Sequence, residues 1–239
     1  MNLHNNQSYL DKLAEQTAKN QTAVRGFVIA IIVLAGGFYA YKAQRERYED
    51  KAQIAFFDGE KAYQDAIAAV TPKEDPKDKK DAKTPPPAPT KKPETAQAEE
   101  KLKQVLKDYP DSNASAHAAL TLSDIYADKD QTAEAVTVLE TRLQNGSMSD
   151  LLLGLLTLRL SSLLEQTKHC DKALTVLEKL STAKGNTEFK PEALMRQALC
   201  QEELGHNDKA KEIYQKLSTE FSDTQQGQQA QKYLNLGAS

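Results

Sequence analysis

The 239-residue sequence predicts an all-α protein in which an N-terminal transmembrane helix precedes an α-solenoid of helical hairpins. Three observations predict this class. Residues 24–41 form an uninterrupted apolar stretch, residues 71–93 are rich in proline and lysine, and small residues recur about every 37 positions in the remaining C-terminal part.

The apolar stretch VRGFVIAIIVLAGGFYAY at residues 24–41 has one charge, Arg25, at its outer edge, where the side chain can reach the interface. Its length fits a single span in contact with membrane lipid. A cleaved signal peptide is the alternative, but residues 1–23 are polar and longer than the short basic start of such a peptide. We therefore expect a retained membrane anchor.

Charge does not predict the orientation of this span. The basic residues near its two ends are about equal in number: Lys12, Lys19 and Arg25 precede it, and Lys42, Arg45, Arg47 and Lys51 follow it.

After the span, residues 42–70 have apolar positions three and four apart, which predicts that the membrane helix continues into a second helical segment. Residues 71–93 hold seven of the nine prolines and seven lysines and predict a solvated tether. The alternative for this insertion is a proline-rich docking peptide around PPPAP.

The C-terminal part contains a repeat. Four alanines, Ala98, Ala135, Ala173 and Ala210, are 37, 38 and 37 residues apart, and each is followed four residues later by a large apolar residue. We call these four the marker alanines. Twelve residues before the last three lie small residues, Ser123, Ser161 and Ala198, and turn-forming sequences lie between. Two antiparallel helices approach closely where side chains are short, so each unit is predicted to be helix, turn, helix.

This pattern resembles the tetratricopeptide repeat, with LMRQALCQEELGHNDKAKEIYQKL as the best copy. The first unit is predicted at residues 52–110, with the proline-rich insertion in its turn. Arg142, Gln197 and Gln201 depart from the pattern because they are polar where small or apolar residues are usual.

A second resemblance covers nearly the whole chain except the insertion. A polar N-terminus, one span ending in small residues and Tyr, the segment KAYQDAIAAV and divergent repeats resemble the ancillary subunit family of the SecYEG translocon, the YfgM type. The resemblance implies a bacterial inner-membrane protein with a cytoplasmic segment 1–23, a span 24–41 and a periplasmic domain 42–239. It also implies binding to the translocon and to the PpiD-type periplasmic chaperone, and assistance to exported unfolded polypeptides.

A candidate binding stripe lies on the first helices of the hairpins. Leu120, Leu158 and Met195 each lie fifteen residues before a marker alanine, so they share one register and are candidate contacts for a client or partner. The alternative is that they pack against the neighbouring hairpin. The leucine run at residues 151–156 predicts a buried helix, with a partner interface as its alternative.

The two cysteines, Cys170 and Cys200, lie near the turn of one hairpin and in the first helix of the next, and they are a candidate disulfide in an oxidising compartment. With His169 and His206 they do not have the spacing of zinc ligands, so we expect no metal.

Catalytic motifs are missing from the sequence, so we expect neither an enzyme nor a cofactor. The net charge of −3 argues against nucleic-acid binding. Two functions stay open: a membrane-anchored repeat protein of the translocon, or a structural adaptor of another envelope machine, such as that of cell division or outer-membrane assembly.

Overall fold

The computed structural model describes residues 21–71, 92–145, 148–182, 185 and 187–236, and every regular element in this part is an α-helix. The predicted all-α class is confirmed. The proline-rich stretch PPPAP and most of residues 1–23 lie outside the described residues, so both predictions for the insertion stay open.

The first described helix, α2, runs without interruption over Gln21–Val70. It contains the apolar stretch and the amphipathic segment after it, so the prediction that the two form one helix is confirmed. The chain divides into two compact units, Met1–Tyr48 and Glu49–Ser239. The second unit begins within α2 and contains all the hairpins.

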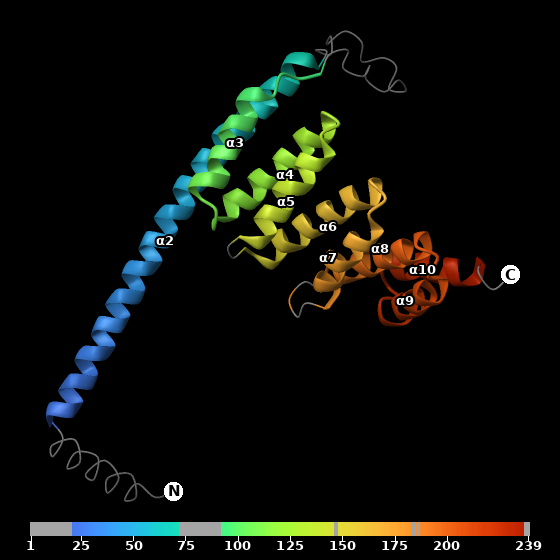
Figure 1. The fold of residues 1–239 in the computed structure, drawn as a ribbon. Helices are drawn as coiled ribbons and strands as arrows, with labels where there is room; N and C mark the ends of the chain where they lie inside the picture. Colours follow the sequence, from blue (N-terminus) through green and yellow to red (C-terminus); the bar gives the residue numbers. More distant parts are fainter. Residues whose placement is uncertain (1–20, 72–91, 146–147, 183–184, 186, 237–239) are drawn as a thin grey trace, which may run out of the picture. The chain divides into compact units, whose positions relative to one another are not determined.

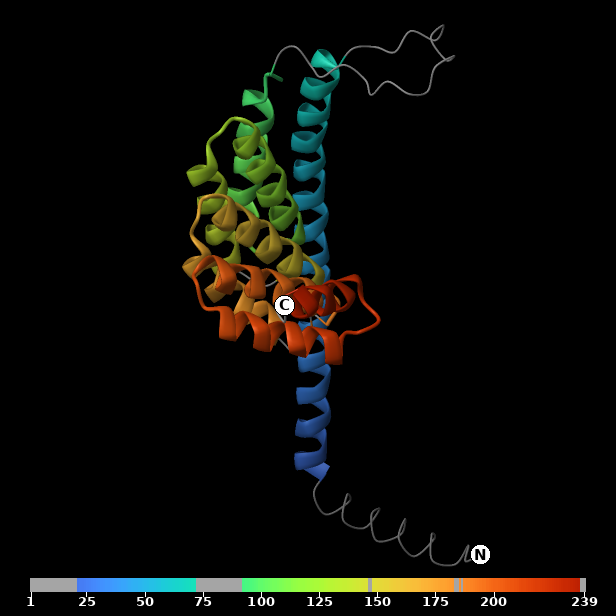
Figure 2. The same cartoon turned by 90° about the vertical axis from the view of Figure 1, so that its right-hand side faces the viewer.

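The helices of the second unit follow one another as hairpins (Figures 1 and 2). Their bounds are α3 Ala96–Asp108, α4 Asn113–Asp128, α5 Thr132–Gln144, α6 Asp150–Gln166, α7 Cys170–Thr182, α8 Lys190–Glu203, α9 Asn207–Glu220 and α10 Gln225–Leu236. The end of α2 contacts α3 around Gly59, where an added Cβ would lie 2.8 Å from Leu102 Cδ2. Helix α4 pairs with α5, α6 with α7 and α8 with α9, and α10 packs on α8 and α9.

The three hairpin turns have the same backbone conformation. Five residues before each of the last three marker alanines, Asp130, Lys168 and Gly205 have φ angles of 63°, 62° and 76°. The next N–H then donates 2.8 Å back to a carbonyl five residues earlier, from Gln131 to Tyr126, His169 to Leu164 and His206 to Gln201. This closes the first helix of each hairpin in the manner of a left-handed C-cap. The repeat read from side chains is therefore also a repeat of backbone geometry.

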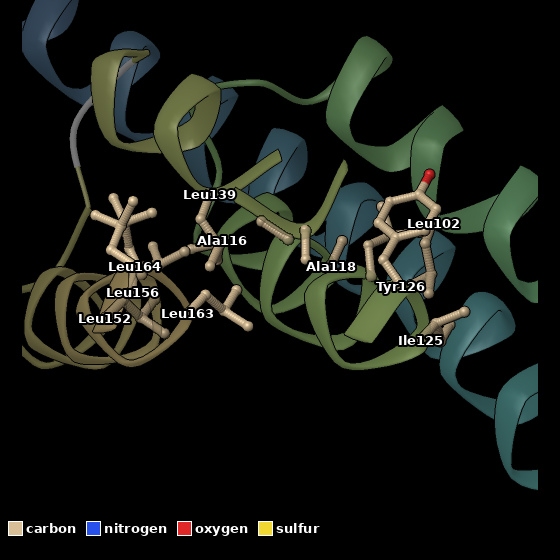
Figure 3. Close-up of a cluster of buried hydrophobic side chains, with 14 of the residues drawn as sticks. Leu102, Ala116, Ala118, Ile125, Tyr126, Leu139, Leu152, Leu156, Leu163 and Leu164 are labelled. Carbon is tan, nitrogen blue, oxygen red and sulfur yellow. The ribbon is translucent and has the colours of Figure 1, made fainter. Parts of the chain in front are cut away.

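The small residues of the repeat lie where the helices meet. All four marker alanines and Ser123, Ser161 and Ala198 are buried. Large side chains such as Leu102, Leu139 and Leu156 lie in the same core cluster as Ala98, Ala135 and Ala173, and Figure 3 shows these leucines. Buried apolar residues form two clusters. The larger extends from Ala52 to Cys200, and the smaller joins α8, α9 and α10.

The polar departures from the repeat find partners inside the stack. Arg142 is 2% exposed, and its guanidinium donates to the carbonyl oxygens of Ser112, at 3.0 Å, and Asn145. It ties the end of α5 to the start of α4, so the guanidinium has a structural role where an apolar side chain was expected. Gln197 is buried and donates to Ser181 Oγ at 3.4 Å.

The leucine run is buried on one side only. Leu152 and Leu156 lie in the larger core cluster, but Leu151 and Leu155 are 52% and 38% exposed. The prediction of a fully buried helix is therefore wrong for these two residues. They lie four positions apart and occupy one face of α6.

Candidate protein-binding surface

The first helices of the hairpins, α4, α6 and α8, present one set of side chains in equivalent register. The set consists of the positions 18, 14, 11 and 7 residues before each of the last three marker alanines. None of these positions is fully buried in any of the three hairpins. We call this set the first-helix face: His117, Thr121, Asp124 and Asp128 on α4; Leu155, Arg159, Ser162 and Gln166 on α6; Glu192, Arg196, Leu199 and Glu203 on α8.

Polar bonds on this face join each first helix to the next. Thr121 Oγ1 donates to Glu60 Oε2 of α2 at 3.1 Å, which links α2 to α4. Arg159 Nη2 lies 2.7 Å from Asp124 Oδ1 and links α4 to α6. Arg196 Nη1 lies 3.0 Å from Glu165 Oε2 and links α6 to α8. At the end of the stack, Gln226 Nε2 of α10 donates to Glu192 Oε2 at 3.0 Å.

The carboxylates in these links are partly removed from water. Burial raises the pKa of Asp124, and the nearby Arg159 charge lowers it only in part. Burial likewise raises the pKa of Glu165 although Arg196 opposes the shift. Each arginine therefore compensates a carboxylate of the neighbouring hairpin, and the ion pair links the two hairpins.

The exposed apolar groups of this region are leucines. Leu155 on α6 and Leu199 on α8, which is 37% exposed, belong to the first-helix face, and Leu151 extends it by one turn. The residues of the predicted stripe, Leu120, Leu158 and Met195, are not part of the first-helix face. Leu120 and Leu158 are half-buried against the larger core, and Met195, 4% exposed, belongs to the smaller core. For Met195 the burial favours the core-packing alternative.

A second surface lies between α3 and α5, on the second helices of their hairpins. It is a groove of about 530 Å³ whose walls are mainly apolar. Its lining includes Leu106, Pro110, Tyr126, Val138, Thr141 and Arg142. The repeat pattern gave no signal for it, because its shape depends on the separation of two helices that are not neighbours in sequence.

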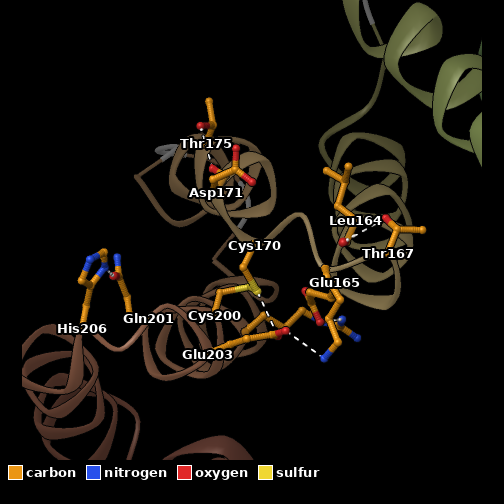
Figure 4. Close-up of a disulfide and its surroundings, with 12 residues drawn as sticks. Leu164, Glu165, Thr167, Cys170, Asp171, Thr175, Cys200, Gln201, Glu203 and His206 are labelled. Atoms are coloured by element: carbon orange, nitrogen blue, oxygen red, sulfur yellow. Dashed lines mark hydrogen bonds and ion pairs between the residues drawn. A yellow bond between two sulfur atoms is a disulfide. The ribbon is translucent and has the colours of Figure 1, made fainter.

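The structure joins Cys170, at the start of α7, to Cys200 of α8 in a disulfide, with Cα atoms 5.2 Å apart (Figure 4). That separation lies within the normal range for a bridge. Glu203 Oε2 lies 3.4 Å from Cys170 Sγ, and Glu203 Oε1 forms an ion pair with Lys168 at 2.8 Å. The bridge therefore connects one hairpin to the next at the point where the larger core ends.

In the part of the chain that the structure describes, α2 is the one helix long and apolar enough to cross a membrane. None of its apolar window is buried by the rest of the protein, unlike the core helix of a soluble domain.

A comparison with the models of known protein families identifies the family of this chain. The model of the tetratricopeptide repeat-like domain matches residues 17–236. The chain belongs to this family. Tetratricopeptide repeat-like domains are in general protein-interaction modules and not catalysts, so the exposed surfaces described above are candidate sites for protein partners. No curated protein and no solved structure matches the chain.

Proposed function

We propose that this tetratricopeptide repeat-like protein is anchored in the bacterial inner membrane by residues 24–41. In this proposal residues 1–23 lie in the cytoplasm and residues 42–239 form a periplasmic domain. The domain binds the Sec translocon, a PpiD-type periplasmic chaperone, or both, and assists exported polypeptides. The arrangement rests on the resemblance to the ancillary translocon subunits.

The observation that carries the proposal is the pair of leucines on the first-helix face. Leu155 and Leu199 are exposed at equivalent faces of two successive hairpins, on helices held in place by ion pairs. Unfolded polypeptides expose apolar side chains, and these bury surface against such leucines with a gain of about 25 cal/mol per Å². The Cys170–Cys200 bridge supports the compartment, because disulfides persist in the oxidising periplasm.

A structural adaptor of another envelope machine is the second candidate, and the groove between α3 and α5 favours it. Its mainly apolar walls enclose about 530 Å³, which suits one segment of a defined partner. An adaptor of this kind binds one folded protein with fixed stoichiometry.

In vivo photocrosslinking tests the proposal. One probe replaces Leu155 on the first-helix face, one replaces Tyr41 at the end of the apolar stretch, and a third replaces Leu204, an exposed leucine at the end of α8, as a control. We expect translocon subunits at Tyr41, many secreted proteins at Leu155 and few adducts at Leu204. One folded envelope protein at both Tyr41 and Leu155 would replace the proposal with the adaptor function.

A further inference from the structure

The first and second helices of the hairpins differ in charge. The first helices, taken as Glu49–Val70 of α2 with α4, α6 and α8, carry 12 acidic and 5 basic residues, a net charge of −7. The second helices, α3, α5, α7 and α9, carry 10 acidic and 9 basic residues, a net charge of −1. Most of the negative charge of the hairpins is therefore carried by the first helices, which include the two helices with the exposed leucines.

The basic groups neutralise the first-helix face only in part. The face carries four carboxylates, Asp124, Asp128, Glu192 and Glu203, against two arginines, and Lys168 pairs with Glu203. Arg159 is held by Asp124, and Arg196 is held by both Glu165 and Glu192. Each arginine thus faces carboxylates from the face itself or from beside it. Asp128 adds a further exposed negative charge at the end of α4.

The field of this region acts on its neighbours. Burial raises the pKa of Tyr63, and the negative charges of Asp128, Asp124 and Glu60 raise it further. A cation brought to this side of α2 and α4 is therefore attracted, and an anion is repelled.

The negative charge of the first helices makes some ligands of the first-helix face more favourable than others. An anionic lipid headgroup or a nucleic acid is repelled by the carboxylates. A second copy of the chain would bring another acidic first-helix face against the first. A polypeptide segment that carries Lys or Arg between large apolar residues satisfies both features, since its apolar groups cover Leu155 and Leu199 while its cations meet the carboxylates.

We propose that the first-helix face binds polypeptide segments that combine large apolar side chains with lysine or arginine, in preference to acidic segments of equal hydrophobicity. This inference rests on the proposed function, because it names the chemistry of the client segments. The inference is nevertheless distinct from the proposed function, since a chaperone can bind exposed apolar segments without any preference for charge.

The test uses the full-length protein in a neutral detergent and three fluorescent peptides of one length. One alternates leucine with lysine, one leucine with glutamate and one serine with lysine, and anisotropy gives each affinity. We expect the leucine–lysine peptide to bind about tenfold more tightly than each of the others and to weaken as salt rises.

Variants locate the site. Replacing both Leu155 and Leu199 by Ser is expected to weaken binding of the leucine–lysine peptide by about tenfold. Leu204→Ser, at a leucine 40% exposed outside the face, is its control. Asp128→Lys should weaken binding by roughly threefold, whereas Glu178→Lys on the second helix α7 should leave it unchanged.

Equal affinity for the lysine and glutamate peptides would overturn the inference, as would equal losses in the face variants and their controls. A different result would contradict the proposed function. If secreted proteins still crosslink at Leu155 while the peptides show no charge preference, client binding stands and the cationic preference is wrong. If no secreted protein crosslinks there, the client-binding function itself is wrong, whatever the peptides show.

Discussion

Removing the Cys170–Cys200 bridge is expected to loosen the C-terminal end of the stack selectively. The bridge ties α7, whose apolar residues belong to the larger core, to α8, where the smaller core begins. In a repeat array each unit contacts only its neighbours, so the loss of one interface acts locally. Helices α8, α9 and α10 should then open before α4, α5 and α6.

The size of the effect follows from the loop that the bridge closes. The two cysteines are 30 residues apart in sequence. For a closed loop of this length, the chain-entropy relation gives about 3.6 kcal/mol of stabilisation at 25 °C. If the second unit unfolds as one body, a loss of that size lowers Tm by about 7 to 14 °C. A separate early transition of α8–α10 would concentrate the loss there.

The assay compares the wild type with a variant in which both cysteines are serine, each with and without reductant. Thiol counting on the unfolded wild type should find no free thiol until reductant is added. Hydrogen exchange followed by mass spectrometry should show faster exchange in α9 and α10 of the variant and unchanged exchange in α4. Reductant should destabilise the wild type alone. Matching exchange and matching Tm in all four samples would refute the reasoning, as would a loss spread evenly over the stack.

Three further predictions concern packing and pH. Gly227→Ala should destabilise α10 by about 1–3 kcal/mol in urea unfolding, because the new Cβ would lie 2.0 Å from the carbonyl oxygen of Phe221; an unchanged midpoint would contradict it. Leu139→Ala should cost about 2–5 kcal/mol, since Leu139 is fully buried, and a loss below 1 kcal/mol would show that the site is loosely packed. Burial pushes the pKa of Glu99 upward, but the hydrogen bonds from Lys129 and Thr95 and the charges of Lys129 and Lys103 together lower that pKa overall. The stability from Glu99 is therefore present above its unfolded pKa and lost as pH falls through the lower folded value, so Glu99→Gln should be less stable than wild type at pH 7 and the difference should shrink below pH 4.5; a constant difference would contradict the assignment.

The repeat and its turns were predictable because they depend on local size and spacing. An alanine or serine recurring at a fixed place reports that a backbone must come close there, and Ala135, Ala173 and Ser161 are all fully buried. Asp130 and Lys168 gave only a general turn signal. Their positive φ became visible in the structure, although Gly205 at the equivalent position of the last hairpin hints at it.

The first-helix face was only partly predictable because a register position does not determine exposure. His117, Leu155 and Glu192 occupy one register position on three helices and differ in size, polarity and charge. The register of Met195 left both a binding contact and core packing open, and its burial in the smaller core favours packing. Exposure depends on how far the adjacent hairpin reaches, which is a property of the packed stack.

The ion pairs and the bridge would keep the first-helix face in one arrangement if it binds flexible segments as proposed. A flexible segment loses conformational entropy when it binds. A receptor that is already rigid loses little conformational entropy of its own. The Arg196–Glu165 pair and the Cys170–Cys200 bridge both connect the α6–α7 hairpin to the α8–α9 hairpin, where the apolar core is divided. Loss of the bridge should therefore weaken crosslinking of clients at Leu199, beyond the division, while leaving it intact at Leu155. Equal loss of crosslinking at Leu155 and Leu199 would mean that α6 and α8 move together. The division of the apolar core would then not allow α8 to move separately.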